Sequence, residues 1–440
     1  MKPNTVYAVD AKGFKRILRA LKHRNFRLFF GGQGISLIGL SMQQVAMSWL
    51  VYRLTNSAFL LGLVGFVALI PSFLFAPFAG PFVDRWDRLR ILIVTQVLAM
   101  IQALILALLA LSGIVTIWHI IFLGLLLGIV NAVDTPTRQS FLLDLLEKKE
   151  DLGNAIALNS SMFNSARLLG PPMAGMLISV LGEGMCFLLN AVSYLAVIIA
   201  LLAMKITPRK IAIRRTHLLQ ELQEGFIYAF GFAPIRFILL LLALVSFMGM
   251  PSIVLMPVFA RDILHGGPHT LGFLVGCSGM GALVGALYLA ARKSVLGLGR
   301  WIAIATSIFG FGLIAFSLSR VVWFSLLLMF LTGFGIMVGM ASSNTLLQTI
   351  VEDDKRGRVM SFYTMAFMGM APFGSLVAGG LASKIGAPNT LLIGGVCCVL
   401  GSFMFAKKLP LLREMIRPIY VKMGIVSPVI SEIQNEPPKY

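Results

Sequence analysis

The chain is 440 residues long, 58% of them hydrophobic and only 12% charged, and its mean hydropathy is +0.88. This composition excludes a soluble globular protein and predicts an integral membrane protein. The formal net charge of +19 would favour nucleic-acid binding only if the basic residues shared one soluble face. They are spread over short segments between apolar runs instead, so we expect no nucleic-acid partner.

Apolar runs of roughly 20 residues recur from about Phe26 to about Leu409, which is the length at which a helix crosses the hydrocarbon of a bilayer. Transmembrane β-strands would be about half as long and would alternate polar with apolar residues, which these runs do not. We therefore expect an all-α membrane protein with twelve transmembrane helices, near residues 26–52, 59–83, 91–112, 117–135, 155–180, 184–204, 235–260, 270–291, 301–319, 322–348, 359–383 and 389–409.

Most lysines and arginines lie in alternate connecting segments, which is typical of cytoplasmic loops. The exceptions are Arg167, which falls inside a span, and four residues in the opposite loops: Arg53, Arg261, Arg320 and Lys384. This distribution predicts that both termini are cytoplasmic, and it accounts for the net charge by topology alone.

The two halves of the chain share a pattern. An ungapped offset of 204 residues places Gly170 on Gly374 and Ala174-Gly175 on Ala378-Gly379, as parallel repeats in secondary transporters do. We expect two pseudo-symmetric six-helix bundles. The predicted parts are a cytoplasmic amphipathic segment (1–25), the first bundle (26–204), a cytoplasmic linker with an amphipathic helix (205–234), the second bundle (235–409) and a cytoplasmic tail (410–440).

Polar residues inside the spans are the candidates for a substrate cavity, because they need partners or water at membrane depth. The candidates are Gln43, Gln44, Asn164, Arg167 and Asn190. Two interpretations of Arg167 stay open: it faces the cavity and attracts an anionic or carbonyl-rich ligand, or it bonds polar groups between helices as structure. The run 91–112 is nearly pure Leu, Ile and Ala, and we expect it to face lipid.

A charged hairpin lies between the second and third spans. It includes Gly80, Asp84, Arg85, Arg88 and Arg90. The Asp84 carboxylate can meet the amino end of span eleven, near 358–361, where free amides and the helix dipole favour negative charge. The alternative is that these charges only set the topology.

Cofactor signals are missing from the sequence. The four cysteines all fall inside spans, so we interpret them as packing residues rather than as metal ligands or disulfides. No phosphate-binding Gly-x-x-x-x-Gly-Lys-Ser/Thr sequence is present, and the spans lack convergent His, Asp or Glu at mid-depth. We expect no cofactor, no metal and no enzymatic activity.

Twelve spans in two related halves, with Gly80-x-x-x-Asp84-Arg85-x-x-Arg88-x-Arg90 after the second span, resemble the major facilitator superfamily. The hairpin departs from the family pattern at Asp87, which replaces a glycine, and at Leu89, which replaces a basic residue. The resemblance implies a transport cycle of alternating access, in which two bundles rock about a central site and the hairpin acts as a conformational latch.

Further motifs resemble the proton-antiporter branch that includes the enterobactin exporter and macrolide efflux pumps. Asp134-x-Pro136-x-Arg138 closes the fourth span, and Gly170-Pro171-x-x-x-Gly175 in the fifth span is similar to the antiporter motif. The resemblance adds Asp134 and Arg138 to the latch, and it makes Gly170, Pro171 and Gly175 packing residues. Proton coupling needs an acid near the membrane, and Asp134 and Asp84 are the candidates.

We therefore expect a secondary active transporter in the bacterial inner membrane that exports amphipathic, siderophore-like small molecules by proton-coupled alternating access. Its partners would be a small-molecule substrate, protons and membrane lipids, and it would be a monomer. The alternatives are a broad drug or macrolide efflux pump, a lysolipid transporter and, outside transport, a membrane receptor or sensor.

Overall fold

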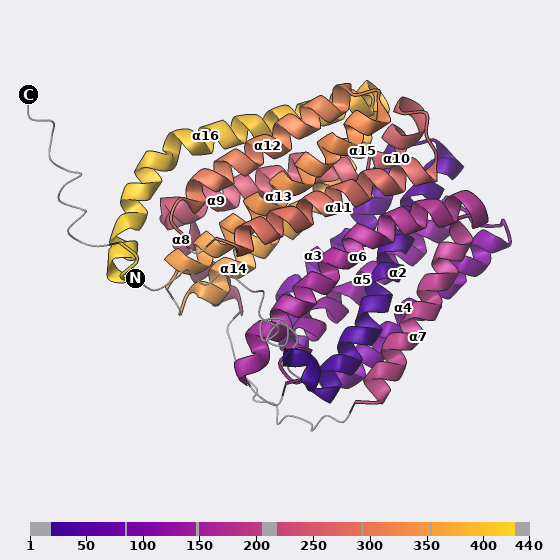
Figure 1. Cartoon of the computed structure of the whole chain (residues 1–440), viewed down its shortest axis with the longest axis horizontal. Coiled ribbons are helices and arrows are strands. Elements are labelled where there is room, and N and C mark those ends of the chain that lie inside the picture. Colours follow the sequence, from indigo (N-terminus) through magenta and orange to yellow (C-terminus); the bar gives the residue numbers. More distant parts are fainter. Residues whose placement is uncertain are drawn as a thin grey trace, which may run out of the picture. The chain divides into compact units, whose positions relative to one another are not determined.

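The computed structural model describes residues 19–83, 86–146, 149–204, 218–292, 294–352 and 354–426, and these residues form helices joined by short turns (Figure 1). No β-strand occurs among the described residues, and the all-α fold class is confirmed. The chain divides into two compact units, which Figure 1 colours mainly indigo to magenta and mainly pink to yellow.

Unit 1 comprises Met1–Arg214 together with Met256–Gly276. Its helices are η1 (Arg19–Lys22), α2 (Arg24–Thr55), α3 (Ala58–Val83), α4 (Arg88–Leu111), α5 (Ile117–Phe141), η2 (Lys149–Asp151), α6 (Leu152–Leu181), α7 (Glu183–Leu202), α10 (Met256–Val258), η5 (Phe259–Ile263) and the start of α11 (Pro268–Ala290).

Unit 2 comprises Arg215–Leu255 and Cys277–Tyr440. Its helices are α8 (Leu218–Gly231), α9 (Ala233–Leu244), η3 (Val245–Gly249), η4 (Met250–Ile253), the rest of α11, α12 (Leu298–Leu318), α13 (Val322–Ile350), α14 (Arg356–Thr364), η6 (Met365–Gly369), α15 (Met370–Ile385) and α16 (Ala387–Lys422).

These units depart from the predicted bundles. Residues 256–276, which end the seventh span and begin the eighth, belong to unit 1 although the sequence assigns them to the second bundle. Hydropathy indicates where a helix crosses the membrane but not which neighbours it packs against. The hydropathy pattern therefore could not predict that residues 256–276 pack with unit 1.

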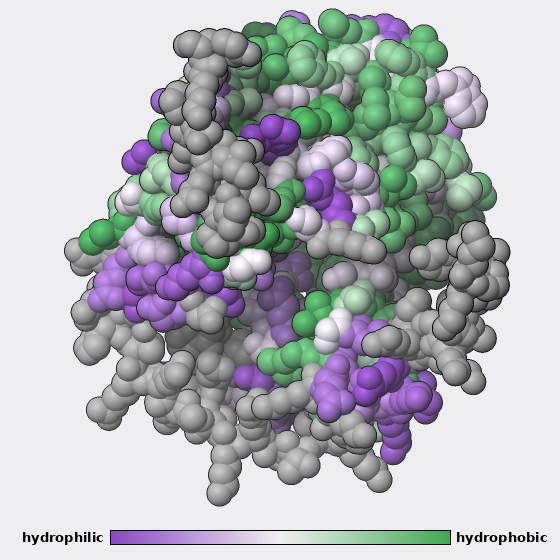
Figure 2. Space-filling view, turned by 60° about the vertical axis from the view of Figure 1, so that its left-hand side comes forward, coloured by the Kyte–Doolittle hydropathy of each residue, from purple (hydrophilic) through white to green (hydrophobic). Residues whose placement is uncertain are grey.

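Each predicted span has its helix. Eleven helices or helix runs among the described residues are long and apolar enough to cross a membrane, and α6 is the twelfth, although its polar face keeps it out of that set. Large apolar side chains are exposed over broad surfaces (Figure 2), including Trp118 and Trp323 at 74% and 82% exposure. A soluble protein would bury such surfaces, whereas lipid covers them in a membrane protein.

The repeat extends to the backbone of one turn. Gly182 joins α6 to α7 with φ 79°, and Gly386, offset by the predicted 204 residues, joins α15 to α16 with φ 85°. Glycine adopts positive φ without the steric cost that a Cβ adds. The two halves therefore use the same residue for the same tight helix connection.

The last helix is longer than predicted. The sequence places a tail from residue 410, but α16 continues through Pro410 and Pro418 to Lys422. Leu412 and Ile416, at 2% and 7% exposure, pack into the core of unit 2. The first part of the predicted tail is therefore a structural part of the unit. Residues 427–440 lie outside the described residues, as do residues 1–18 of the predicted amino-terminal segment.

Candidate functional site

The candidate site begins with α6, the most polar of the long helices. Ser160, Asn164 and Arg167 follow one another at spacings of four and three residues, so they share one face of the helix. The Arg167 side chain is exposed, and no described residue forms a hydrogen bond or ion pair with it. A different face of α6 carries the buried Met162, which packs with Leu37 of α2. The structure thus gives α6 an open polar surface near its middle.

The same face is covered further along the helix by the start of α11. A Cβ on Gly175 would come within 2.6 Å of the Pro268 carbonyl oxygen, and a Cβ on Gly272 would collide with the Pro171 carbonyl oxygen. On its other side, Gly170 lies against α2 in an equally close contact. The three predicted packing residues therefore lie where α6 approaches its neighbours most closely, and the polar face ends under α11.

Polar contacts hold η5, the segment that precedes α11, to the end of α2. The Tyr52 hydroxyl donates a hydrogen bond to Asp262, and Arg261 Nη1 donates to Asn56 Oδ1 at 2.6 Å. The Arg261 guanidinium also lies 5.8 Å from the centre of the Tyr52 ring, within cation–π range. We call these four residues the rim clasp. It joins the end of α2 to η5.

The helix run that leads to the rim clasp is irregular. It passes from α9 through a π-helical turn (η3), a 3₁₀ turn (η4) and α10 into a second π-helical turn (η5). Pro251 lies in η4, and the border between the two units falls between Leu255 and Met256. Because π-helical turns and prolines interrupt the regular hydrogen bonding of a helix, this run departs from a regular α-helix where the chain passes from unit 2 to unit 1.

A buried charge cluster lies where α4 meets the end of α5. Asp134, 1% exposed, forms an ion pair with Arg138 one turn later on α5. Its Oδ1 also accepts hydrogen bonds from Thr95 Oγ1 and Gln96 Nε2, both at 2.8 Å. Both α4 partners fall in the run 91–112, for which the sequence predicts a lipid-facing helix, and this expectation is wrong at Thr95 and Gln96, which are buried. The signal was there, since Thr and Gln stand out in an otherwise apolar run.

The chain is similar along almost its whole length to known transporters. The model of the transmembrane secretion effector family, within the major facilitator superfamily, matches residues 17–418. The chain belongs to this family. It is 28% identical over 408 residues to the staphyloferrin A transporter of Staphylococcus aureus, covering 88% of this chain and 98% of that protein.

Further relatives are named as efflux proteins, and solved transporter structures share the fold. Macrolide efflux protein A of Streptococcus pyogenes is 25% identical, covering 86% of this chain and 95% of that protein, and the multidrug efflux pump Tap of Mycolicibacterium fortuitum is 24% identical, covering 87% and 93%. The fold matches the peptide transporter POT with a TM-score of 0.70 at 11% identity, covering 89% of this chain and 95% of that structure. The protein is a membrane-integral transporter of the bacterial plasma membrane.

In this member of the secretion effector family, the described part of the charged hairpin bonds within unit 1. Arg88 Nη1 donates to Asp144 Oδ2 at 2.8 Å, and Asp87 accepts from the Leu89 amide at 3.0 Å as the cap of α4. Arg90 Nε lies 3.6 Å from Asp87 Oδ2. Asp87, the departure from the family pattern, therefore has a local role as a helix cap.

The structure describes only part of the predicted latch. Asp84 and Arg85 lie outside the described residues, and Gly80 belongs to α3 without a description of its surroundings. Near the amino end of α14, where the sequence places a partner for Asp84, Arg358 Nη1 donates to Glu224 Oε2 of α8 at 2.7 Å.

Two of the five cavity candidates are instead part of the helix packing. Gln43 and Asn190 are fully buried, and the Asn190 amide donates to Gln43 Oε1 at 2.7 Å. Gln43 in turn donates to Gln102 of α4 at 3.1 Å. These amides bond one another between α2, α4 and α7, so we correct the assignment of Gln43 and Asn190 from cavity to structure. The neighbouring Gln44 is exposed and remains a candidate.

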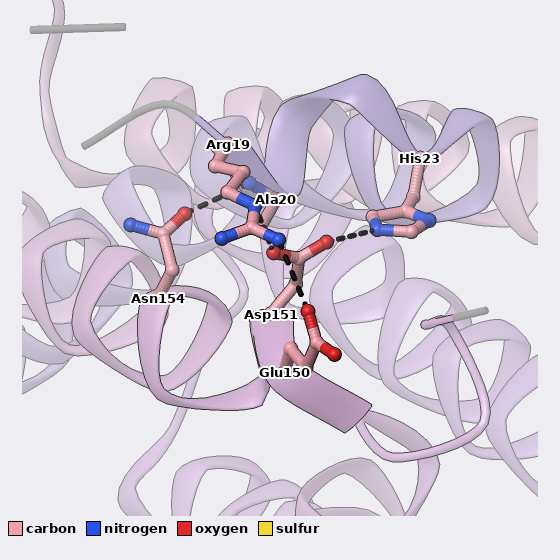
Figure 3. A network of polar contacts seen from close by, with 6 residues as sticks. All are labelled: Arg19, Ala20, His23, Glu150, Asp151 and Asn154. Carbon is pink, nitrogen blue, oxygen red and sulfur yellow. Dashed lines mark hydrogen bonds and ion pairs between the residues drawn. The ribbon is translucent and has the colours of Figure 1, made fainter. Parts of the chain in front are cut away.

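The amino end of the described chain is tied to the start of α6 (Figure 3). Arg19 and His23 both contact the Asp151 carboxylate, at 2.6 and 2.8 Å, and the Ala20 amide donates to Asn154 Oδ1 at 2.8 Å. Asp151 is only 5% exposed on its side chain. These contacts fix where α6 and its polar face begin relative to α2.

The described residues offer no site for a metal ion. They contain no group of three or more His, Cys, Asp or Glu side chains that could hold one, and the four cysteines are free thiols in the spans.

Proposed function

We propose that the protein exports amphipathic, siderophore-like small molecules by proton-coupled alternating access. The observation that carries the proposal is the exposed polar face of α6, with Arg167 near the middle of the membrane span. Such a face is costly against lipid and favourable against the polar part of a substrate. Relatives named for staphyloferrin A transport and for macrolide and multidrug efflux support the same activity.

Asp134 is the residue that we propose for proton coupling. Asp134 is buried and forms an ion pair with Arg138, so adding a proton to its carboxylate would cancel their attraction. Arg138, and the side chains of α4 that donate to Asp134, would then be free to rearrange. A single protonation can thereby bias two helix arrangements that differ by a few kcal/mol. Asp84 remains the second candidate, outside the described residues.

The proposal includes a monomer with both termini in the cytoplasm. The basic loops of the sequence support this orientation. In that orientation, the rim clasp lies on the outer side and the cluster around Asp134 toward the inner side.

The proposal is tested with everted membrane vesicles whose lumen is acidified. Labelled staphyloferrin A and a labelled macrolide are offered in the bath, with vesicles lacking the protein and vesicles treated with a protonophore as controls. We expect gradient-dependent uptake of staphyloferrin A. Uptake of the macrolide alone would favour drug efflux, and binding without any uptake would favour a receptor.

A further inference from the structure

We propose that Arg167 anchors a subsite for a carboxylate or another anionic group of the transported molecule. The inference rests on the proposed function, because it takes the open face of α6 as the surface that meets substrate. It goes further by assigning a chemical class, anionic amphipaths, and by excluding cationic ones.

The depth of Arg167 excludes lipid headgroups as its ligand. At 1.5 Å per residue, Arg167 lies about 22 Å from Leu152 and about 21 Å from Leu181, near the middle of α6. Half of the hydrocarbon core of a bilayer is about 15 Å thick, so lipid phosphates lie well beyond a side chain at this depth. A ligand for this guanidinium has to enter the protein.

A purely structural role does not fit the contacts. A buried arginine that only ties helices together is expected to be paired, as Arg138 is with Asp134. Arg167 is exposed instead, and none of the described residues bonds it. Its guanidinium carries five N–H donors.

The neighbouring groups on this face can also donate. Asn164 Nδ2 donates one hydrogen bond, at 2.9 Å, to the Ser160 carbonyl oxygen of its own helix, which leaves the second N–H of the amide for a ligand. The exposed Ser160 hydroxyl lies one turn further along the same face. A guanidinium flanked by an amide and a hydroxyl matches the acceptors of a carboxylate, and charge-assisted bonds of this kind are the strong ones.

Among the described residues, no acidic side chain forms an ion pair with Arg167. Asp134 is buried and paired, and Glu183 and Asp262 lie at helix ends, bonded by Arg53 and Tyr52. The open face of α6 therefore carries a net positive charge at a depth where screening by water is weak. It attracts anions and repels cations.

The subsite lies next to the end of the polar face that α11 covers. Arg167 lies one turn before Pro171, where α11 covers the polar face. An anionic group held by Arg167 would therefore lie directly beside the covered end of this face.

The test is equilibrium binding to the purified full chain in lipid nanodiscs, without a proton gradient. The probes are a dansyl-labelled long-chain carboxylate, the primary amide of the same chain and the corresponding amine. We expect wild type to bind the carboxylate about tenfold more tightly than the amide, and the amine most weakly. Arg167→Gln should abolish the preference with the amide affinity unchanged, and Arg167→Lys should keep part of it.

Arg320→Gln, which removes an exposed arginine of unit 2, is the matched control and should keep the full preference. Equal binding of carboxylate and amide by wild type, no carboxylate binding, or an unchanged preference in Arg167→Gln would overturn the subsite. If Arg167→Gln does not fold, the wild-type preference and Arg167→Lys still decide. A carboxylate preference without export in vesicles would keep the subsite and contradict only the proposed function.

Discussion

At the scale of single residues, variants of the Asp134–Arg138 ion pair distinguish a role in stability from a role in proton coupling. Asp134→Asn keeps the shape of the side chain but leaves Arg138 buried without its counter-charge. Removing one partner of a buried ion pair typically costs about 3–5 kcal/mol, whereas replacing both costs much less. We expect Asp134→Asn to lower the melting temperature in detergent, and Asp134→Asn with Arg138→Gln to recover most of the loss.

Both variants should lose gradient-driven transport, because neither retains the carboxylate that we propose to bind the proton. A double variant as unstable as the single one would show that the loss does not come from the unpaired charge of Arg138. A stable double variant that still transports along a proton gradient would move the coupling to Asp84.

Two adjacent glutamines of α2 show why the sequence alone does not predict burial at single positions. Gln43 and Gln44 are adjacent and look alike in the sequence, yet one is fully buried among amides and the other is exposed. Adjacent positions on a helix point about 100° apart, so the choice depends on which helices pack on each side. In the same way, Thr95 and Gln96 are recognisable as polar residues in an apolar run. Their hydrogen bonds to Asp134 could not be predicted, because Asp134 lies on another helix.

At the scale of helices, α16 carries a prediction with a matched control. Leu412 is 2% exposed in the core of unit 2, whereas its neighbour Leu411 is 49% exposed. Leu412→Ala should destabilise the protein by about 2–5 kcal/mol, because it leaves a cavity in a packed core. Leu411→Ala should have little effect. Thermal unfolding in detergent measures both, and equal melting temperatures would mean that residues beyond Leu409 form a tail, as the sequence alone suggests.

Helices are the scale at which the sequence is most informative. A span needs only length and hydropathy, and both are local properties, so eleven spans are recovered by these two properties alone. The repeat could be predicted too, since Gly182 and Gly386 obey the offset found from other residues. The end of α16 could not, because Leu412 and Ile416 are helical and buried only through contacts with other helices.

At the scale of the whole molecule, the segment Met256–Gly276 matters most, because it belongs to the second half in sequence and to unit 1 in space. It is held by glycine contacts and the rim clasp, and it joins unit 2 at Leu255, within the irregular run from η3 to η5. Because the glycine contacts involve mainly backbone atoms, few interdigitated side chains would have to separate for the segment to move away. We therefore expect this segment to leave unit 1 during each transport cycle.

Gly272→Ala tests this expectation, because its Cβ would collide with the Pro171 carbonyl oxygen and oppose docking by about 1–3 kcal/mol. The matched control is Gly31→Ala, since a Cβ on Gly31 meets nothing within 4 Å. The reporter is Thr270→Cys, at a position that is 4% exposed in the docked segment. With site-specific mass spectrometry as the readout, a maleimide should label this thiol faster in the Gly272→Ala background than in Gly31→Ala, and transport should fall only in the former. Equal labelling and equal transport would mean that the segment is a fixed part of unit 1, and that the transport cycle opens elsewhere.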